Sequence, residues 1–321
     1  MKEEQFKRSY KKAVDNMKTN DAMQKRMEHT MNAHRKSQKL PRKKLYIAAS
    51  VVIAASIGLA APSVWQQVNG PAAPTEVAQV EPGAAFDPVV IPKIELPGAE
   101  DGMMASMIGL VFYEGNIYTQ SATTIDAAGA LALRGEKLGT TTGGIHELSG
   151  QDDYSELAST IGEADIYAVK GYDTSFRIMS YTEIDGQKYV QLFDQANGIT
   201  VSSGADLFGK LNLQGHVASA DWETFNSWNN GLLELQPLAA GESLDSFISA
   251  LYAAKPVATS PELEERVYGG EDRKIIYLTL EDNTQVQLVL FGEGLVRYGN
   301  APVFFEVESG AFQGFWESMA E

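Results

Sequence analysis

The chain has 321 residues, which is enough for one or two globular domains. Its apolar fraction of 44% and its charged fraction of 21% exclude a disordered chain. It contains no cysteine, which excludes a disulfide framework, a lipobox lipoprotein anchor and cysteine-based zinc sites.

Charge is divided unevenly along the chain. Residues 1–44 hold 14 Lys and Arg against 5 Asp and Glu, whereas residues 66–321 hold 12 against 37. The two parts therefore carry about +9 and about −25, in agreement with the net charge of −16. Such an asymmetry indicates two segments that face different surroundings.

Between these parts lies an uncharged run of 21 residues, Leu45–Trp65. As a helix that rises about 1.5 Å per residue, it would cover about 30 Å, the thickness of a bilayer core. Basic residues crowd its N-terminal side, and no Lys or Arg follows it until Lys93. The positive-inside rule therefore predicts a single-pass protein of the cell membrane, with its N-terminus in the cytoplasm and its C-terminal part outside.

Two alternatives for this run stay open. Small residues at Gly58–Ala61 resemble a signal-peptide cleavage site, although the 44 preceding residues are far more than a signal peptide carries. A buried helix of a globular domain is the other alternative, but a basic run and a proline-rich stretch flank this segment.

The basic segment 1–44 shows the pattern of two short amphipathic helices. Apolar residues recur every three or four positions in its first half, and Asp21 with Gln24 fits a capping box that opens a second helix. Two such helices cannot form a core alone, so we expect their apolar faces to bind a partner. The expected partner-binding residues are Phe6, Tyr10, Val14, Met17, Met23, Met27 and Met31. The alternative is a disordered tail that only orients the protein in the membrane.

Residues 66–103 contain six of the twelve prolines, so this segment is expected to be an extended stalk. Its second half, VVIPKIELP, is apolar enough to dock on the following domain as an edge strand. Residues 104–236 then read as a β-rich domain. Strands are expected in MIGLVFYEGNIYTQ, DIYAVKGYD, SFRIMSYTEI and QKYVQLFDQ, with a hairpin turn at Asp185-Gly186. A short helix is expected in ADWETFNSW, with its aromatic residues packed in the core or, as a minority reading, stacking on carbohydrate.

Residues 237–321 are expected to form an α+β subdomain that begins near Pro237. SLDSFISALYAAK has its apolar residues on one helical face, and GAFQGFWESM reads as a final helix that buries Phe312, Phe315 and Trp316. Between them, RKIIYLTLED, TQVQLVLFGE, VRYG and VFFEVE predict a strand meander with helices on one face. The fold class is therefore α+β, and whether 104–236 and 237–321 are separate domains stays open.

No residues form a recognised catalytic or metal-binding motif, so we expect no enzyme activity, no cofactor and no metal. The four histidines lack any short metal-ligand spacing. Gly204–Lys210 fits GxxxxGK, but Leu207 and Phe208 fill the loop and Leu211 replaces the Ser or Thr that holds magnesium. The glycines of Gly135–Gly143 are assigned to turns between short strands. Carboxylates are plentiful, and their default role is a solvated acidic surface.

The run YKKAVDNMKTNDAMQKRMEHTMNAHRKSQKLPRKK, followed by one apolar span, resembles the N-terminus of anti-sigma-factor-like membrane proteins of Gram-positive bacteria. The resemblance covers about residues 8–65, and the zinc-binding His/Cys signature of one large anti-sigma class is missing. It implies that the helical segment binds an extracytoplasmic-function sigma factor and that the outer domain senses an envelope signal. The outer region is similar to uncharacterised extracytoplasmic domains of sporulating Firmicutes, which supplies no function.

The sequence therefore predicts a non-enzymatic membrane regulator. Its cytoplasmic helices would bind a sigma factor or another regulator, and its outer domain would bind an envelope protein, a wall polymer or another ligand. We expect no direct contact with nucleic acid, because no recognised fold accompanies the basic residues. The alternative is a membrane-anchored envelope-binding module without a cytoplasmic role. An extracytoplasmic hydrolase is a third hypothesis, which would need two facing carboxylates or a His–acid pair across a cleft.

Overall fold

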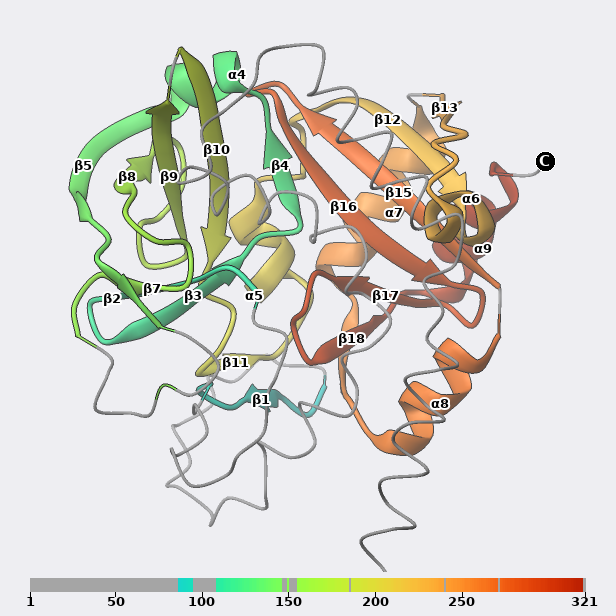
Figure 1. Cartoon of the computed structure of the whole chain (residues 1–321). Coiled ribbons are helices and arrows are strands. Elements are labelled where there is room, and N and C mark those ends of the chain that lie inside the picture. Colours follow the sequence, from blue (N-terminus) through green and yellow to red (C-terminus); the bar gives the residue numbers. More distant parts are fainter. Residues whose placement is uncertain are drawn as a thin grey trace, which may run out of the picture.

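The computed structural model describes residues 86–94, 108–145, 149, 155–184, 186–239, 241–270 and 272–319 (Figure 1). The expected cytoplasmic helices, the apolar run 45–65 and the first part of the stalk lie outside the described residues, as do all seven expected partner-binding residues, Phe6, Tyr10, Val14, Met17, Met23, Met27 and Met31. No helix in the described part is long and apolar enough to span a membrane.

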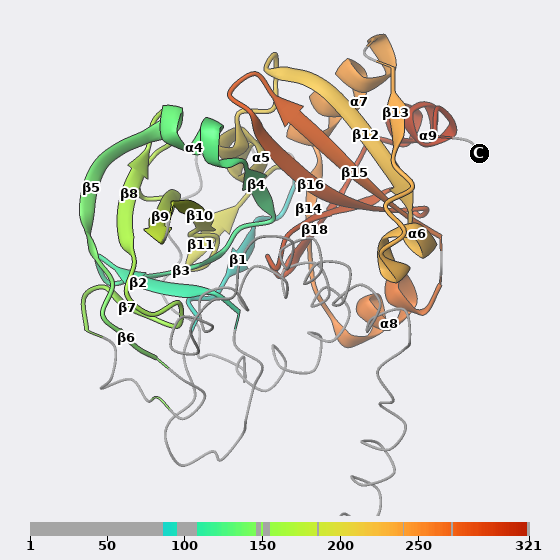
Figure 2. The same ribbon diagram turned by 45° about the horizontal axis from the view of Figure 1, so that its top comes forward.

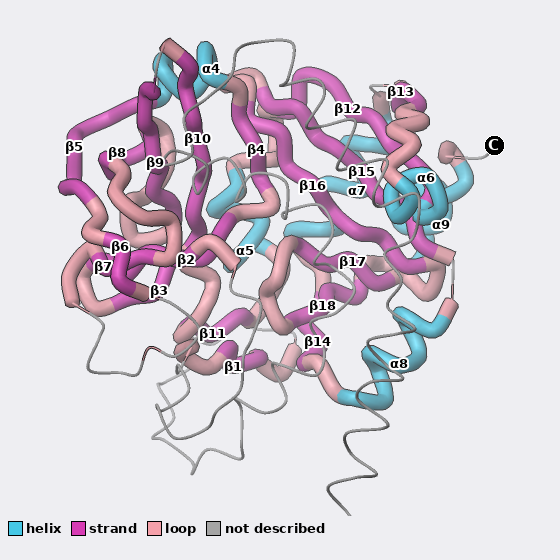
Figure 3. Tube along the Cα trace, in the orientation of Figure 1, coloured by secondary structure: helices cyan, strands magenta, loops and turns pink. Residues whose placement is uncertain are grey.

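The described residues form a strand-rich α+β body, as the sequence predicts. Two large sheets stand side by side, with helices at their ends and faces (Figures 1 and 3). The first sheet has the order β5 (Arg134–Thr140), β8 (Asp165–Val169), β9 (Arg177–Ile184), β10 (Gln187–Asp194), β3 (Asn116–Gln120), β2 (Leu110–Tyr113), β7 (Ala158–Ser159) and β6 (Gly143–Gly144). The second has the order β13 (Gln236–Leu238), β12 (Val217–Thr224), β15 (Arg273–Leu280), β16 (Thr284–Phe291), β17 (Leu295–Tyr298), β18 (Val303–Glu306) and β14 (Lys255–Ala258).

The β9–β10 hairpin of the first sheet has the register that its predicted two-residue turn dictates. Ile184 pairs with Gln187, and the pairing continues without a shift to Arg177 and Asp194. Gly186 has a φ of +80°, which glycine adopts without steric cost in such a turn. This register decides which side chains face each other at the far end of the hairpin.

The second sheet is covered on both faces. Alternate residues of β15 and β16, such as Leu278 and Leu288, pack against α7 (Glu242–Tyr252) and α9 (Ser309–Glu317). Between these helices the rings of Phe247 and Phe315 stack with centroids 4.2 Å apart. Residues of the opposite parity, including Phe291, pack against α8 (Pro261–Gly269). The expectation of helices on one face was therefore wrong, because α8 covers the other face.

Several elements differ from the sequence-based expectation. ADWETFNSW is a short helix only in its second half, because its first residues belong to β12 and α6 spans Phe225–Asn230. Gly135 and Gly139 lie within strand β5 and not in turns. Trp316 is half-buried, whereas Phe312 and Phe315 are buried as expected. The second sheet takes β12 from the region before Pro237, and Pro237 itself lies inside β13, so strand pairing crosses the expected division.

Smaller elements complete the body and join its two sheets. β4 (Thr123–Ile125) follows β3 along the chain but pairs with β16 of the second sheet, and α4 (Ala127–Leu133) comes directly after it. α5 (Ala205–Phe208) continues into a 3-10 turn at Gly209–Leu211. The strand expected in VVIPKIELP is confirmed as β1 (Val89–Ile91), which pairs antiparallel with β11 (Ile199–Val201) in a separate two-stranded sheet. Figure 2 shows this small sheet between the two large ones.

Candidate functional site

A buried ion pair lies where the two large sheets meet. Arg177 of β9 and Asp194 of β10 face each other in the hairpin register, and their exposed fractions are 0% and 3%. Arg177 Nε donates to Asp194 Oδ1 at 2.7 Å, and Nη2 donates to Oδ2 at 2.9 Å. This two-pronged geometry is the strongest form of a guanidinium–carboxylate contact.

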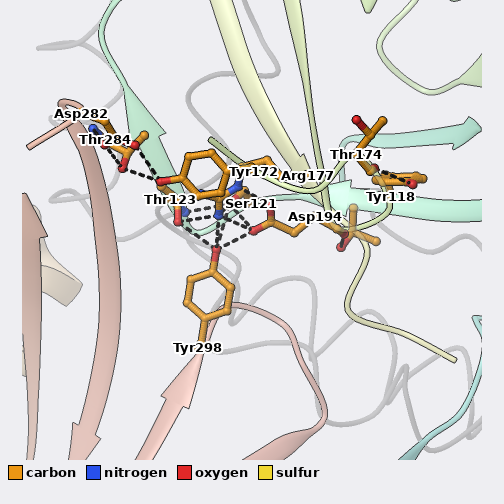
Figure 4. Close-up of polar contacts among 11 residues, drawn as sticks. Tyr118, Ser121, Thr123, Tyr172, Thr174, Arg177, Asp194, Asp282, Thr284 and Tyr298 are labelled. Atoms are coloured by element: carbon orange, nitrogen blue, oxygen red, sulfur yellow. Dashed lines mark hydrogen bonds and ion pairs between the residues drawn. The ribbon is translucent and has the colours of Figure 1, made fainter. Parts of the chain in front are cut away.

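Hydroxyl groups from both sheets complete the shell of this ion pair (Figure 4). Tyr298 of β17 donates to Asp194 Oδ2 at 2.5 Å, and Ser121, between β3 and β4, donates to the same oxygen at 2.6 Å. Arg177 Nη2 also donates to Thr123 Oγ1 of β4 at 2.9 Å. Because Tyr298 belongs to the second sheet, its hydroxyl joins that sheet directly to the ion pair of the first.

A second polar link runs beside the first. The Arg177 guanidinium lies 4.6 Å above the ring of Tyr172, which precedes β9. The Tyr172 hydroxyl donates to Asp282 Oδ2 at 2.9 Å and lies 3.2 Å from Thr284 Oγ1. Asp282 lies in the turn of the β15–β16 hairpin, and Thr284 is the first residue of β16. We call the residues Ser121, Thr123, Tyr172, Arg177, Asp194 and Tyr298, with Asp282 and Thr284, the polar junction.

The electrostatics of the polar junction favour one protonation state. Burial opposes the charge on Arg177, but the charge and hydrogen bond of Asp194, together with Tyr298 and Tyr172, outweigh burial and raise the pKa of the guanidinium above its ordinary value. Burial, followed by the charge of Asp194, also raises the pKa of Tyr298. Burial raises the pKa of Tyr172 to about 12. The guanidinium of Arg177 therefore stays charged and the hydroxyls of Tyr172 and Tyr298 stay neutral over the physiological range of pH.

One donor of the junction is left without a hydrogen bond. Arg177 Nη1 is buried and has no partner among the described residues. An unsatisfied buried donor costs about 1–3 kcal/mol, which the aromatic face of Tyr172 offsets only in part. The unsatisfied donor lowers the stability of the junction, while its other hydrogen bonds fix the arrangement of its polar groups. The junction therefore acts as a structural connection between the two sheets.

A second polar group supports a loop at the surface. Glu223 of β12 is fully buried, and it accepts hydrogen bonds from Ser227 Oγ and Tyr277 OH, each at 2.6 Å. Ser227 Oγ in turn accepts from the amide of Glu234 at 2.9 Å, and the carbonyl of Ser227 accepts from the amide of Leu232 at 2.9 Å. These bonds fix the segment between α6 and β13.

That segment exposes three leucines, which we call the leucine loop. Leu232, Leu233 and Leu235 are 51%, 66% and 48% exposed. Leu233 has a φ of +56°, a left-handed conformation that is strained for leucine. Exposed apolar side chains held in a strained and hydrogen-bonded segment are a candidate contact surface. Their neighbour Pro237 lacks an amide hydrogen, which limits strand addition at the outer edge of β13.

The other residues singled out from the sequence lie in ordinary surroundings. Gly204–Lys210 folds as α5 and the start of the 3-10 turn, with Leu207 and Phe208 in the core, so no loop is left to wrap a phosphate. Trp222 and Trp228 are buried, as the packing interpretation predicts. His216 is exposed, and His146 lies outside the described residues. Among the described side chains, no group of acidic residues and histidines could hold a metal ion.

The polar junction was not predicted from the sequence, although part of its signal is present there. A two-residue turn at Asp185-Gly186 pairs Ile184 with Gln187, and each step back along one strand matches a step forward along the other. This register places Arg177 opposite Asp194. A single arginine within the apolar strand FRIMSY, opposite an aspartate, indicates a buried ion pair. Tyr298 and Asp282 could not be found in this way, because they come from the other sheet.

Compared with known proteins, the chain matches no family model, no curated protein and no solved structure. The described residues therefore establish a strand-rich α+β fold, and no relative supplies a function.

Proposed function

We propose that the chain is a single-pass, non-enzymatic membrane regulator of the anti-sigma-factor-like kind. The segment 1–44 binds a sigma factor or another cytoplasmic regulator, and the α+β body binds a ligand of the cell envelope. The observation that carries this proposal is the change of charge from about +9 to about −25 across the uncharged run 45–65. A basic flank on one side of such a run orients it with that side in the cytoplasm.

The body suits the outer half of such a protein. Its large negative charge keeps it soluble and away from other polyanions. The polar junction holds its two sheets in one relative orientation, so a ligand bound on one sheet can affect the other through a fixed connection. Coupling of this kind needs a physical link between two elements, and the junction supplies one.

The test is capture of cytoplasmic proteins by the segment 1–44. The matched control is the same segment with Met23, Met27 and Met31 replaced by glutamine, which keeps the charge and removes the apolar contacts. The proposal predicts that the native segment captures a sigma factor or one other soluble protein. The control should bind this protein at least about tenfold more weakly, which corresponds to a loss of about 1.4 kcal/mol of binding free energy. Equal capture by both, lost in high salt, would instead show attraction by charge alone.

The alternative function, an envelope-binding module without a cytoplasmic role, is favoured by the leucine loop. Its three exposed leucines offer the body a surface for another exported molecule. This alternative predicts that deletion of residues 1–34 leaves the phenotype unchanged. It also predicts that serine at Leu232, Leu233 and Leu235 removes binding of the body to envelope material.

A further inference from the structure

The two-stranded sheet of β1 and β11 is held differently from the rest of the body. β11 pairs only with β1, so within the described part of the chain it has no other strand neighbour. β1 has three residues, and Pro88 and Pro92 flank it. Because proline has no amide hydrogen, neither Pro88 nor Pro92 can donate a hydrogen bond to β11 at the ends of the strand.

Ile91 is the one fully buried side chain of β1. It is 1% exposed and packs in the cluster that contains Val201 and Leu207, whereas Val89 is partly buried against the same cluster and Val90 is 69% exposed. The strand thus lies on the surface of the body through backbone pairing, with Ile91 as its main apolar anchor and Val89 as a partly buried second contact. This is the form in which sheet edges recognise extended peptides, with affinity from the main chain and selectivity from alternate side-chain pockets.

The contacts on the C-terminal side of β1 are also made mostly by the backbone. The carbonyl of Pro92 accepts from the amide of Gly198 at 3.1 Å, and the amide of Ile94 donates to Asn197 Oδ1 at 3.3 Å. Asn197 is buried and donates to the carbonyl of Ile117 at 2.8 Å, so its side chain is fixed in the body. A receiving surface for an extended chain is therefore built from β11 and the loop before it.

We propose that β11 and the pocket that holds Ile91 form a binding site for an extended peptide with a β-branched aliphatic anchor. The chain's own residues 89–91 occupy this site in cis, and a second peptide of the same kind takes it by displacing them. This inference goes beyond the proposed function and does not depend on the membrane span or on a sigma factor.

Occupancy of this site is connected to the polar junction. Asp194 ends β10, and only residues 195–198 separate it from β11. The amide of Gln195 donates to the carbonyl of Phe176 at 2.7 Å, next to Arg177. Exchange of the strand on β11 therefore acts on the loop that positions the carboxylate of the buried ion pair.

The experiment measures binding of a fluorescein-labelled peptide with the sequence of residues 86–94 to the full-length protein in a non-ionic detergent, by fluorescence anisotropy. Ile91→Asp in the protein removes the cis anchor, and the site should then bind the peptide at least about tenfold more tightly than the native chain does, because a tethered competitor acts at an effective concentration on the order of millimolar. The same peptide with aspartate at the anchor position is the control ligand and should not bind.

A disulfide supplies the opposite perturbation. Val90 and Thr200 are paired directly across the two strands, and the chain has no native cysteine. Paired residues of adjacent strands lie within the reach of a disulfide. Val90→Cys with Thr200→Cys should abolish peptide binding when oxidised and restore it after reduction, and this comparison serves even if Ile91→Asp fails to fold. Equal binding to the oxidised and reduced forms, or no binding to a folded Ile91→Asp protein, would overturn the proposal.

Discussion

The polar junction makes a quantitative prediction for Asp194→Asn. This change keeps the shape of the side chain but removes the negative charge that accompanies Arg177, whose side chain is fully buried. Removing one partner of a buried ion pair leaves the other charge without compensation and costs about 3–5 kcal/mol. A domain is stable by only about 5–15 kcal/mol, so the loss is a large part of the total. For a body of this size it corresponds to a fall in Tm of roughly 10 °C.

The assay is urea unfolding of the full-length protein in a non-ionic detergent, followed by the fluorescence of its tryptophans. A double-mutant cycle with Arg177→Met, Asp194→Leu and the pair of both changes separates the ion pair from other losses. The double variant should lose less stability than the sum of the two single variants, because no unpaired charge remains. Arg266→Gln is the control, since the ion pair of Arg266 with Glu293 is exposed and is worth about 1 kcal/mol or less.

Two results would refute this reasoning. The first is a loss below about 1 kcal/mol for Asp194→Asn, the range of an exposed pair. The second is strict additivity in the cycle, which would mean that Arg177 and Asp194 stabilise the body independently.

Three further predictions concern single positions. Gly204→Ala should unfold the body, because the added Cβ would lie 1.8 Å from a backbone oxygen of α7. Gly209→Ala should be neutral or stabilising, because the nearest atom to its Cβ would lie 3.9 Å away. Thermal melts of the two variants compare them directly. Leu233→Gly should stabilise the body by about 1 kcal/mol, because glycine adopts the left-handed conformation without strain. An unchanged or lower urea midpoint for this variant would count against strain at this position. Burial raises the pKa of Tyr172 from 10.0 to about 12 and raises that of Tyr298 in the same direction. The neutral form of Tyr172 therefore contributes stability that is complete below pH 10 and is lost as pH rises through about 12, and the stability from neutral Tyr298 is lost in the same direction. Unfolding and tyrosinate absorbance should rise together above pH 10. Tyr298→Phe should reduce the number of tyrosines that titrate with unfolding.

Local pattern was enough to predict the strands and helices that pack by simple periodicity. β15 and β16 alternate between buried and partly buried positions as their sequences alternate in polarity, and α7 buries the leucine and phenylalanine face that its spacing predicts. The hairpin of β9 and β10 follows from the turn at Asp185-Gly186. In each case the residues that decide the structure are neighbours along the chain.

Long-range contacts explain the elements that the pattern did not predict. Trp222 and Trp228 have helical spacing, but β12 gains two neighbouring strands, β13 and β15, and this pairing outweighs the local preference. The partners Asp194 and Tyr298 are 104 residues apart, and no period or turn relates them. A contact of this kind depends on how the two sheets pack together, and the local sequence pattern of either sheet does not predict that packing.

We propose that segment 1–44 and the α+β body lie on opposite sides of a membrane. Because the chain has no cysteine, single-cysteine variants at Ser37 and at the exposed Gln313 of α9 report the two sides without interference. Intact cells are treated with a membrane-impermeant maleimide before and after permeabilisation. The account predicts that Gln313→Cys is labelled in intact cells and that Ser37→Cys is labelled only after permeabilisation. Labelling of both variants only after permeabilisation, or of Ser37→Cys in intact cells, would contradict it.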